Sequence, residues 1–175
     1  MILSKIKQLI GWWFNRHQPQ HSAKMSNPKT VEEYIAYHIY IPTPEYKLNK
    51  GVVYNTNTIN RDFSHCGAEK QKAEELVETV RGYKLPSRQK CLFVCNSQEV
   101  RYWYNYICKK RANGMCVAVV CKLKLKGTLF WTYADYFTME AYWNPDEKPI
   151  EKEGLFEGEY EVEEVYNNVD GFPQG

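Results

Sequence analysis

The strongest constraint on the fold comes from residues 85–103 (LPSRQKCLFVCNSQEVRYW), where three kinds of local structure follow one another. Pro86 and Ser87 are typical turn residues. The apolar run 91–95 is short enough for a strand that is buried on both faces. Asn96 or Ser97 can then cap a helix that carries Glu99 in its first turn. The segment therefore predicts a loop that enters the core, a buried strand and a strand-to-helix corner.

Apolar periodicity predicts further elements on both sides of this segment. Alternation and β-forming residues predict strands over 34–41, 52–55, 115–126 and 155–166, with 129–133 continuing the third after a break at Gly127. Helical spacing predicts a helix over 68–82, and Thr30 with Glu33 forms a capping-box pattern that predicts a short helix at 30–33. The mixed order of helices and strands predicts a single α+β domain over 30–167.

The ends of the chain differ from this domain. Residues 1–16 (MILSKIKQLIGWWFNR) have apolar residues at helical spacing with basic residues opposite, which predicts an amphipathic helix too short to span a bilayer. That helix could lie on a membrane surface, or it could dock on its own domain or on a second subunit. Residues 17–29 are interpreted as a linker, and residues 168–175 as a tail.

Composition favours a globular protein, because 43% of the 175 residues are hydrophobic and 25% are charged. Charge is unevenly distributed: residues 144–175 hold 10 acidic residues and 2 lysines, whereas the rest holds 21 basic and 11 acidic residues. The basic part could attract a phosphate-bearing ligand or a nucleic acid, or it could simply be a solvated surface.

Cysteine spacing disfavours a zinc site, since no pair shows the CxxC pattern. Several of the six cysteines lie in apolar runs, where cysteine acts as a small hydrophobic residue. We interpret them as free thiols in a reducing compartment, which predicts a cytoplasmic protein, peripheral on a membrane if residues 1–16 bind there. The six are Cys66, Cys91, Cys95, Cys108, Cys116 and Cys121.

Three positions carry side chains suited to chemistry. His38 lies in the middle of a predicted strand, and Glu153 lies at the start of the last one. The guanidinium of Arg88, which follows Ser87, could bind a phosphate or a carboxylate. Each has an ordinary structural alternative: a core histidine, a solvent-facing acid and a salt bridge.

The order of these motifs resembles the ADP-ribosyltransferase superfamily in its His/aromatic/Glu type, and within it an uncharacterised bacterial family with that fold. The resemblance covers residues 34–166. It rests on a Tyr-His-Ile strand around His38, a Leu-x-x-Gly turn ending at Gly51, a Pro-Ser-Arg segment before Leu-Phe and a Tyr- and Trp-rich helix, and an acid before the last strand. It implies mixed sheets in a split β-sandwich with short flanking helices.

The resemblance also implies roles for single residues. His38 would hydrogen-bond the nicotinamide-side ribose of NAD, Gly51 would close a turn over the dinucleotide, and Phe93 would stack on nicotinamide. Ser87 and Arg88 would flank the cleft, with Arg88 reaching a phosphate or the substrate. Glu153 would be the catalytic carboxylate, and Glu151 would orient the acceptor from the same side of the strand. The spacing leaves Glu157 and Glu159 as an alternative pair.

These roles suit the reaction, because breaking the nicotinamide–ribose bond builds an oxocarbenium-like cation that a nearby carboxylate stabilises. The expected function is an enzyme that consumes NAD, transferring ADP-ribose to a protein or nucleic acid or hydrolysing NAD. Such chemistry occurs in toxins, phage proteins and defence systems. Two alternatives stay open: an inactive module that binds a nucleotide or a protein, and a protein that binds nucleic acid or membrane surfaces through its basic part and residues 1–16.

Overall fold

The computed structural model describes residues 28–61, 63, 67–111, 118–133, 142–143 and 152–172. Five strands are present in this part of the chain: β1 (Lys29–Tyr40), β2 (Val53–Asn55), β3 (Leu92–Val94), β4 (Val119–Tyr133) and β5 (Lys152–Tyr166). The α-helices are α2 (Ala68–Thr79) and α3 (Val100–Arg111), and the short 3₁₀ helices are η1 (Thr56–Thr58) and η2 (Ser97–Glu99). The fold is therefore of the α+β class, as the order of the sequence patterns predicts.

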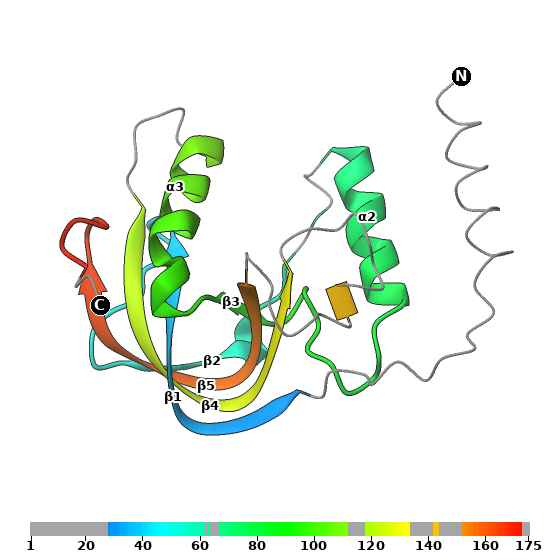
Figure 1. Cartoon of the computed structure of the whole chain (residues 1–175), viewed down its shortest axis with the longest axis horizontal. Coiled ribbons are helices and arrows are strands. Elements are labelled where there is room, and N and C mark those ends of the chain that lie inside the picture. The colour runs from blue at the N-terminus through cyan, green and yellow to red at the C-terminus, as the bar shows by residue number, and fades with distance from the viewer. Residues whose placement is uncertain are drawn as a thin grey trace, which may run out of the picture.

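All the strands belong to one antiparallel sheet. Its order is β1-β4-β5-β2, and β3 pairs with another part of β5. The end of β3 also returns to β1, because Tyr37 and Cys95 exchange two backbone hydrogen bonds of 2.9 and 2.8 Å. β3 thus lies between β5 and β1, and the sheet curls strongly around it (Figure 1).

The two long strands β4 and β5 are bent near their middle, where Gly127 pairs with Gly158. Both glycines have positive φ angles, 152° and 144°. A Cβ atom on Gly127 would lie 2.2 Å from the carbonyl oxygen of Glu157, so only glycine allows the two backbones to approach this closely. The predicted strand break at Gly127 is wrong, since β4 continues through this residue as one strand.

The hydrophobic core has three parts. The largest lies along the curled sheet, where Leu123 and Leu125 of β4 are fully buried. The alternating Lys122 and Lys124 face outward and pair with Glu163 and Glu161 of β5. A second part packs α3 against β1 and β4. The third packs Val77 of α2 against the far end of β4 and β5 (Figure 1). The two helices therefore cover different ends of the same bent sheet.

Local predictions succeeded where no distant partner competed with them. The helix over 68–82 and the buried strand over 91–95 are confirmed, although α2 ends at Thr79. Asn96 caps the corner as expected, because its side chain accepts a 3.1 Å hydrogen bond from the Glu99 N–H. The predicted short helix at 30–33 is wrong: these residues belong to β1, where Thr30 pairs with Thr128 of β4. Pairing across the sheet outweighs the local capping pattern.

The cysteine prediction is confirmed in part. Cys91, Cys95 and Cys121 are free and buried. Burial raises the pKa of the Cys91 thiol to about 12, which leaves it without nucleophilic character at neutral pH. Cys108, in contrast, is disulfide-bonded, so the free-thiol prediction is wrong there. Its partner lies outside the described residues.

The predicted N-terminal helix at 1–16 and most of the linker at 17–29 also lie outside the described residues, and Lys29 already belongs to β1. At the other end of the chain, within the predicted tail, Val169 is buried and the ring of Phe172 packs 5.0 Å from that of Tyr37. The region after β5 therefore contributes to the core beneath α3.

Candidate functional site

Arg88 lies in the loop before β3 and joins α2 to the start of β5. Its side chain is buried, with Nε 2.9 Å from a carboxylate oxygen of Glu74 on α2 and Nη1 2.6 Å from Glu153 Oε2 on β5. Nη1 also donates a hydrogen bond to the hydroxyl oxygen of Tyr142. A buried charge is tolerated only when it is paired, and two carboxylates here share one guanidinium. The group that the resemblance assigns to a phosphate is thus already held by the protein's own acids.

Ser87 is held in the same way by two further acidic residues. Its backbone N–H donates to Glu157 Oε1 at 2.7 Å, and its hydroxyl donates to Glu78 Oε2 at 3.1 Å. The second oxygen of Glu78 accepts a 2.7 Å hydrogen bond from the backbone N–H of Arg88. The Ser-Arg loop is therefore fixed between α2 and β5. Glu157, which the spacing left as an alternative catalytic acid, has a structural contact here, whereas Glu159 is exposed.

Glu153 stands at the start of β5, opposite Thr132 of β4. Its Oε2 is held by Arg88 and also accepts a 3.1 Å hydrogen bond from the Tyr142 hydroxyl. Burial, together with the charge of Glu153, raises the pKa of Tyr142, so this hydroxyl keeps its proton. The other oxygen, Oε1, makes no hydrogen bond within the described part of the chain, and the side chain is 13% exposed. Glu153 is thus an oriented carboxylate with one oxygen available.

His38 lies on β1, next to β3, and is buried. Its Nδ1 is 2.7 Å from the carbonyl oxygen of Phe93, so Nδ1–H donates there, and Nε2 accepts from the Tyr46 hydroxyl at 3.3 Å. Burial lowers the pKa of His38 to about 4, and the charge of Arg61 acts in the same direction. The imidazole is therefore neutral at pH 7, with its hydrogen-bond acceptor directed at Tyr46.

Phe93 of β3 lies between the histidine and the carboxylate. Its neighbour across the sheet is Leu155 of β5, two residues after Glu153. The guanidinium of Arg61 lies 4.3 Å from the centre of its ring, and that of Arg88 lies 4.7 Å from it. Two cations thus contact the ring at the position that the resemblance assigns to nicotinamide.

The structure does not bring Gly51 to this group. Gly51 forms an exposed turn with a φ angle of 77°, and its N–H donates to the carbonyl of Val162 at 2.8 Å. Val162 lies on the half of β5 beyond the bend at Gly158, whereas Glu153 lies on the half before it. Glu151, the predicted acceptor-orienting acid, lies outside the described residues.

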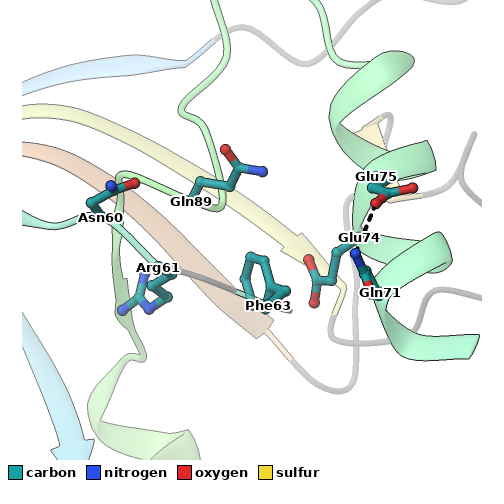
Figure 2. Close-up of a pocket in the computed structure, with 7 residues that line it drawn as sticks. All are labelled: Asn60, Arg61, Phe63, Gln71, Glu74, Glu75 and Gln89. Atoms are coloured by element: carbon teal, nitrogen blue, oxygen red, sulfur yellow. Dashed lines mark hydrogen bonds between the residues drawn. The ribbon is translucent and has the colours of Figure 1, made fainter. Parts of the chain in front are cut away.

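A pocket of about 330 Å³ opens between the segment after η1 and helix α2. Figure 2 shows Arg61 at one end, the α2 side chains at the other, and Phe63 between them. Glu74 links this pocket to the ion-pair network, since its carboxylate also binds Arg88. The lining residues are Asn60, Arg61, Phe63, Gln71, Glu74, Glu75 and Gln89.

Comparison with known proteins gives one family. The sequence profile of a family of proteins of unknown function, DUF2441, matches residues 6–168. This chain belongs to the DUF2441 family. No curated protein matches the sequence. Among the described residues, no helix is long and apolar enough to cross a membrane.

Sequence reasoning missed several residues of this DUF2441 site, among them Tyr46, Glu74 and Tyr142, and the one with the least signal is Arg61. Its Nη1 donates to the carbonyl oxygen of Cys91 and lies 3.4 Å from that of Arg88. Burial lowers the pKa of its guanidinium. An arginine in a polar loop shows no periodicity, and its partners are backbone atoms that any sequence would supply. No pattern in the sequence could therefore have indicated its position.

Proposed function

We propose that this DUF2441 protein is an NAD-consuming enzyme that transfers ADP-ribose to a macromolecular acceptor or to water. The observation that carries the proposal is the state of Glu153, a carboxylate with Oε2 held by Arg88 and Tyr142 and Oε1 available. Such a group can stabilise the positive charge that develops on the ribose as nicotinamide leaves, and it can accept a hydrogen bond from a ribose hydroxyl. Arg88 is then a positioning residue for Glu153.

The neighbourhood of Glu153 also supports this proposal. His38, Phe93 and Glu153 lie on β1, β3 and β5; β3 pairs with β5, and Cys95, the residue after β3, forms a bridge to Tyr37 of β1. The hydrogen bond between His38 and the Phe93 carbonyl joins the first two, and the guanidinium of Arg88 contacts both the Phe93 ring and Glu153. We further propose that the curled sheet is a variant of the ADP-ribosyltransferase fold, with β3 at the junction of its two halves.

The test is nicotinamide release from NAD by the purified protein, with and without added acceptor protein. Glu153→Gln keeps the size of the side chain but removes its charge, so we expect the rate to fall by at least about 100-fold. Glu159→Gln is the matched control, because Glu159 is exposed on the same strand. The wild-type rate should persist in that variant.

A wild-type rate in Glu153→Gln would remove Glu153 from the mechanism, and a loss in Glu159→Gln would favour the alternative acid pair. Stimulation by acceptor protein would identify a transferase, whereas release in its absence would identify a hydrolase. Thermal unfolding of each variant separates loss of chemistry from loss of fold.

A second candidate function is a binding module without catalysis. It is favoured by the contacts that already occupy the site: Tyr46 on His38, and two guanidinium groups on the Phe93 ring. A ligand would have to displace them to reach the positions that the resemblance assigns. NAD binding without nicotinamide release would support this function, and Glu153-dependent release would exclude it.

A further inference from the structure

The pocket beside α2 is polar at both ends, and the two ends differ in charge. Arg61 and Asn60 form one end, and Gln71 and Glu75 of α2 form the other, with the Phe63 ring between them (Figure 2). The charge of Glu74 is offset by its 2.9 Å ion pair with Arg88. The Glu75 carboxylate accepts a 3.2 Å hydrogen bond from Gln71 and is exposed. The pocket therefore presents a cation, a flat apolar surface and hydrogen-bond acceptors in that order.

Arg61 is the unusual member of this set. No carboxylate of the described chain lies within ion-pair distance of it, and its hydrogen bonds go to two neutral carbonyl oxygens. Arg88, which contacts the same Phe93 ring, has two carboxylate partners. A partly buried guanidinium without a counter-charge is suited to binding an anion, because an anion restores the interactions that burial removed.

We propose that this pocket binds the nucleoside phosphate part of the ligand, with the phosphate at Arg61 and the base against Phe63. A base with an exocyclic amino group fits the α2 end, where the Glu75 carboxylate and the amide oxygen of Gln71 can accept hydrogen bonds. A volume of about 330 Å³ is at the lower end of the range for small-ligand pockets and suits one base with its sugar. The inference rests on the proposed function in that it assigns the adenosine diphosphate half of NAD to this pocket.

The pocket and Glu153 are connected through one guanidinium. Arg88 holds Glu74, which lines the pocket, through Nε, and it holds Glu153 through Nη1. A dinucleotide with its adenosine half in the pocket would reach past Arg88 toward Glu153. Arg61 therefore takes the phosphate-binding role that the sequence resemblance assigns to Arg88.

The experiment compares the affinities of ADP and adenosine, measured by calorimetry without divalent cations. We expect the wild-type protein to bind ADP more tightly than adenosine. Arg61→Gln should weaken ADP binding by roughly tenfold to 100-fold and leave adenosine binding within about twofold. Lys50→Gln is the matched control: it removes one positive charge from an exposed side chain, and both affinities should persist.

Two further variants test the pocket if Arg61→Gln is unstable. Arg61→Lys keeps the charge and should retain most of the preference for ADP. Phe63→Leu should weaken ADP and adenosine alike, because it removes the stacking surface that both share. Equal affinities for ADP and adenosine in the wild-type protein, or unchanged ADP affinity in Arg61→Gln, would overturn the proposal. The absence of saturable ADP binding would do the same.

These outcomes are separable from those of the enzyme assay. Arg61-dependent ADP binding without nicotinamide release would support the nucleotide site in the pocket and contradict the proposed enzyme activity. Release that depends on Glu153, together with unchanged ADP affinity in Arg61→Gln, would keep the enzyme and place its phosphate site elsewhere.

Discussion

Two arginines contact the ring of Phe93, and their surroundings are opposite. Arg88 belongs to a closed side of the site, where Glu74, Glu78, Glu153 and Glu157 hold the Ser-Arg loop through ion pairs and hydrogen bonds. Arg61 belongs to an open side, where its hydrogen bonds within the described residues go to backbone carbonyls, and where the acceptor nitrogen of His38 accepts from the Tyr46 hydroxyl. The closed side connects elements of the fold, and the open side keeps groups that a ligand can bind.

This difference shows why residue type alone does not assign a role. Both side chains carry guanidinium groups near one ring, and both are at least partly buried. What separates them is the number of carboxylates within reach: two for Arg88, and none within ion-pair distance among the described residues for Arg61. The two carboxylates compensate the buried charge of Arg88, so that removing either side would leave an unpaired charge in the fold. Arg61 has no such compensation among the described residues, and in our proposal an anion supplies it on binding.

The largest expected effect is the difference in protein stability between variants that replace one arginine or the other. Arg88→Met leaves Glu74 and Glu153 buried without their cation, so the free energy of unfolding should fall by about 3–5 kcal/mol. Arg61→Met leaves two carbonyl oxygens without their hydrogen-bond donor at a partly exposed site, so the free energy of unfolding should fall by only about 1–2 kcal/mol. Urea denaturation measures both values. Equal losses would break the comparison, because Arg61 would then be as structural as Arg88.

The open side should also be visible in the pH dependence of stability, through His38. Its pKa is about 4 in the folded protein, against about 6.5 when unfolded, so the unfolded chain binds the proton more readily between these values. The contribution of the neutral His38 to the free energy of unfolding is fully present above about pH 6.5 and is lost as pH falls toward 4. The total loss is about 3 kcal/mol. Urea denaturation from pH 4 to 8 measures it.

His38→Gln serves as the reference in the same titration, since the acidic residues contribute equally to both proteins. The wild-type protein should lose more stability between pH 6.5 and pH 4 than this variant does. Parallel curves for the two proteins would show that His38 is hydrated and that its side of the site is more open than the hydrogen bonds indicate.

The sequence predicted most of the elements, because their signals are local. The Asn96 cap and the apolar run before it are sufficient to place β3 and the corner that leads into α3. The patterns at Thr30 and Gly127 predict the wrong structure because the conformations of these residues depend on β4 pairing with β1 and β5, which no short pattern contains. Within the site, the order of motifs selected His38, Arg88 and Glu153, whose neighbours in space lie 8 to 65 residues away along the chain. The acids that hold Arg88 could not be predicted, because helices and strand ends are generally rich in glutamate.

The smallest expected effect tests whether the closed side depends on specific acids or on acidity in general. Glu78 and Glu75 both lie on α2, but only Glu78 binds the Ser-Arg loop, through the Arg88 N–H and the Ser87 hydroxyl. Glu78→Gln keeps the shape and one acceptor oxygen but weakens these hydrogen bonds and the ion pair with Arg81, for an expected loss of about 1.5 kcal/mol. Glu75→Gln should change the free energy of unfolding by less than about 0.5 kcal/mol. Similar losses in the two variants would mean that overall charge, rather than the individual contacts of the loop, holds α2 against the sheet.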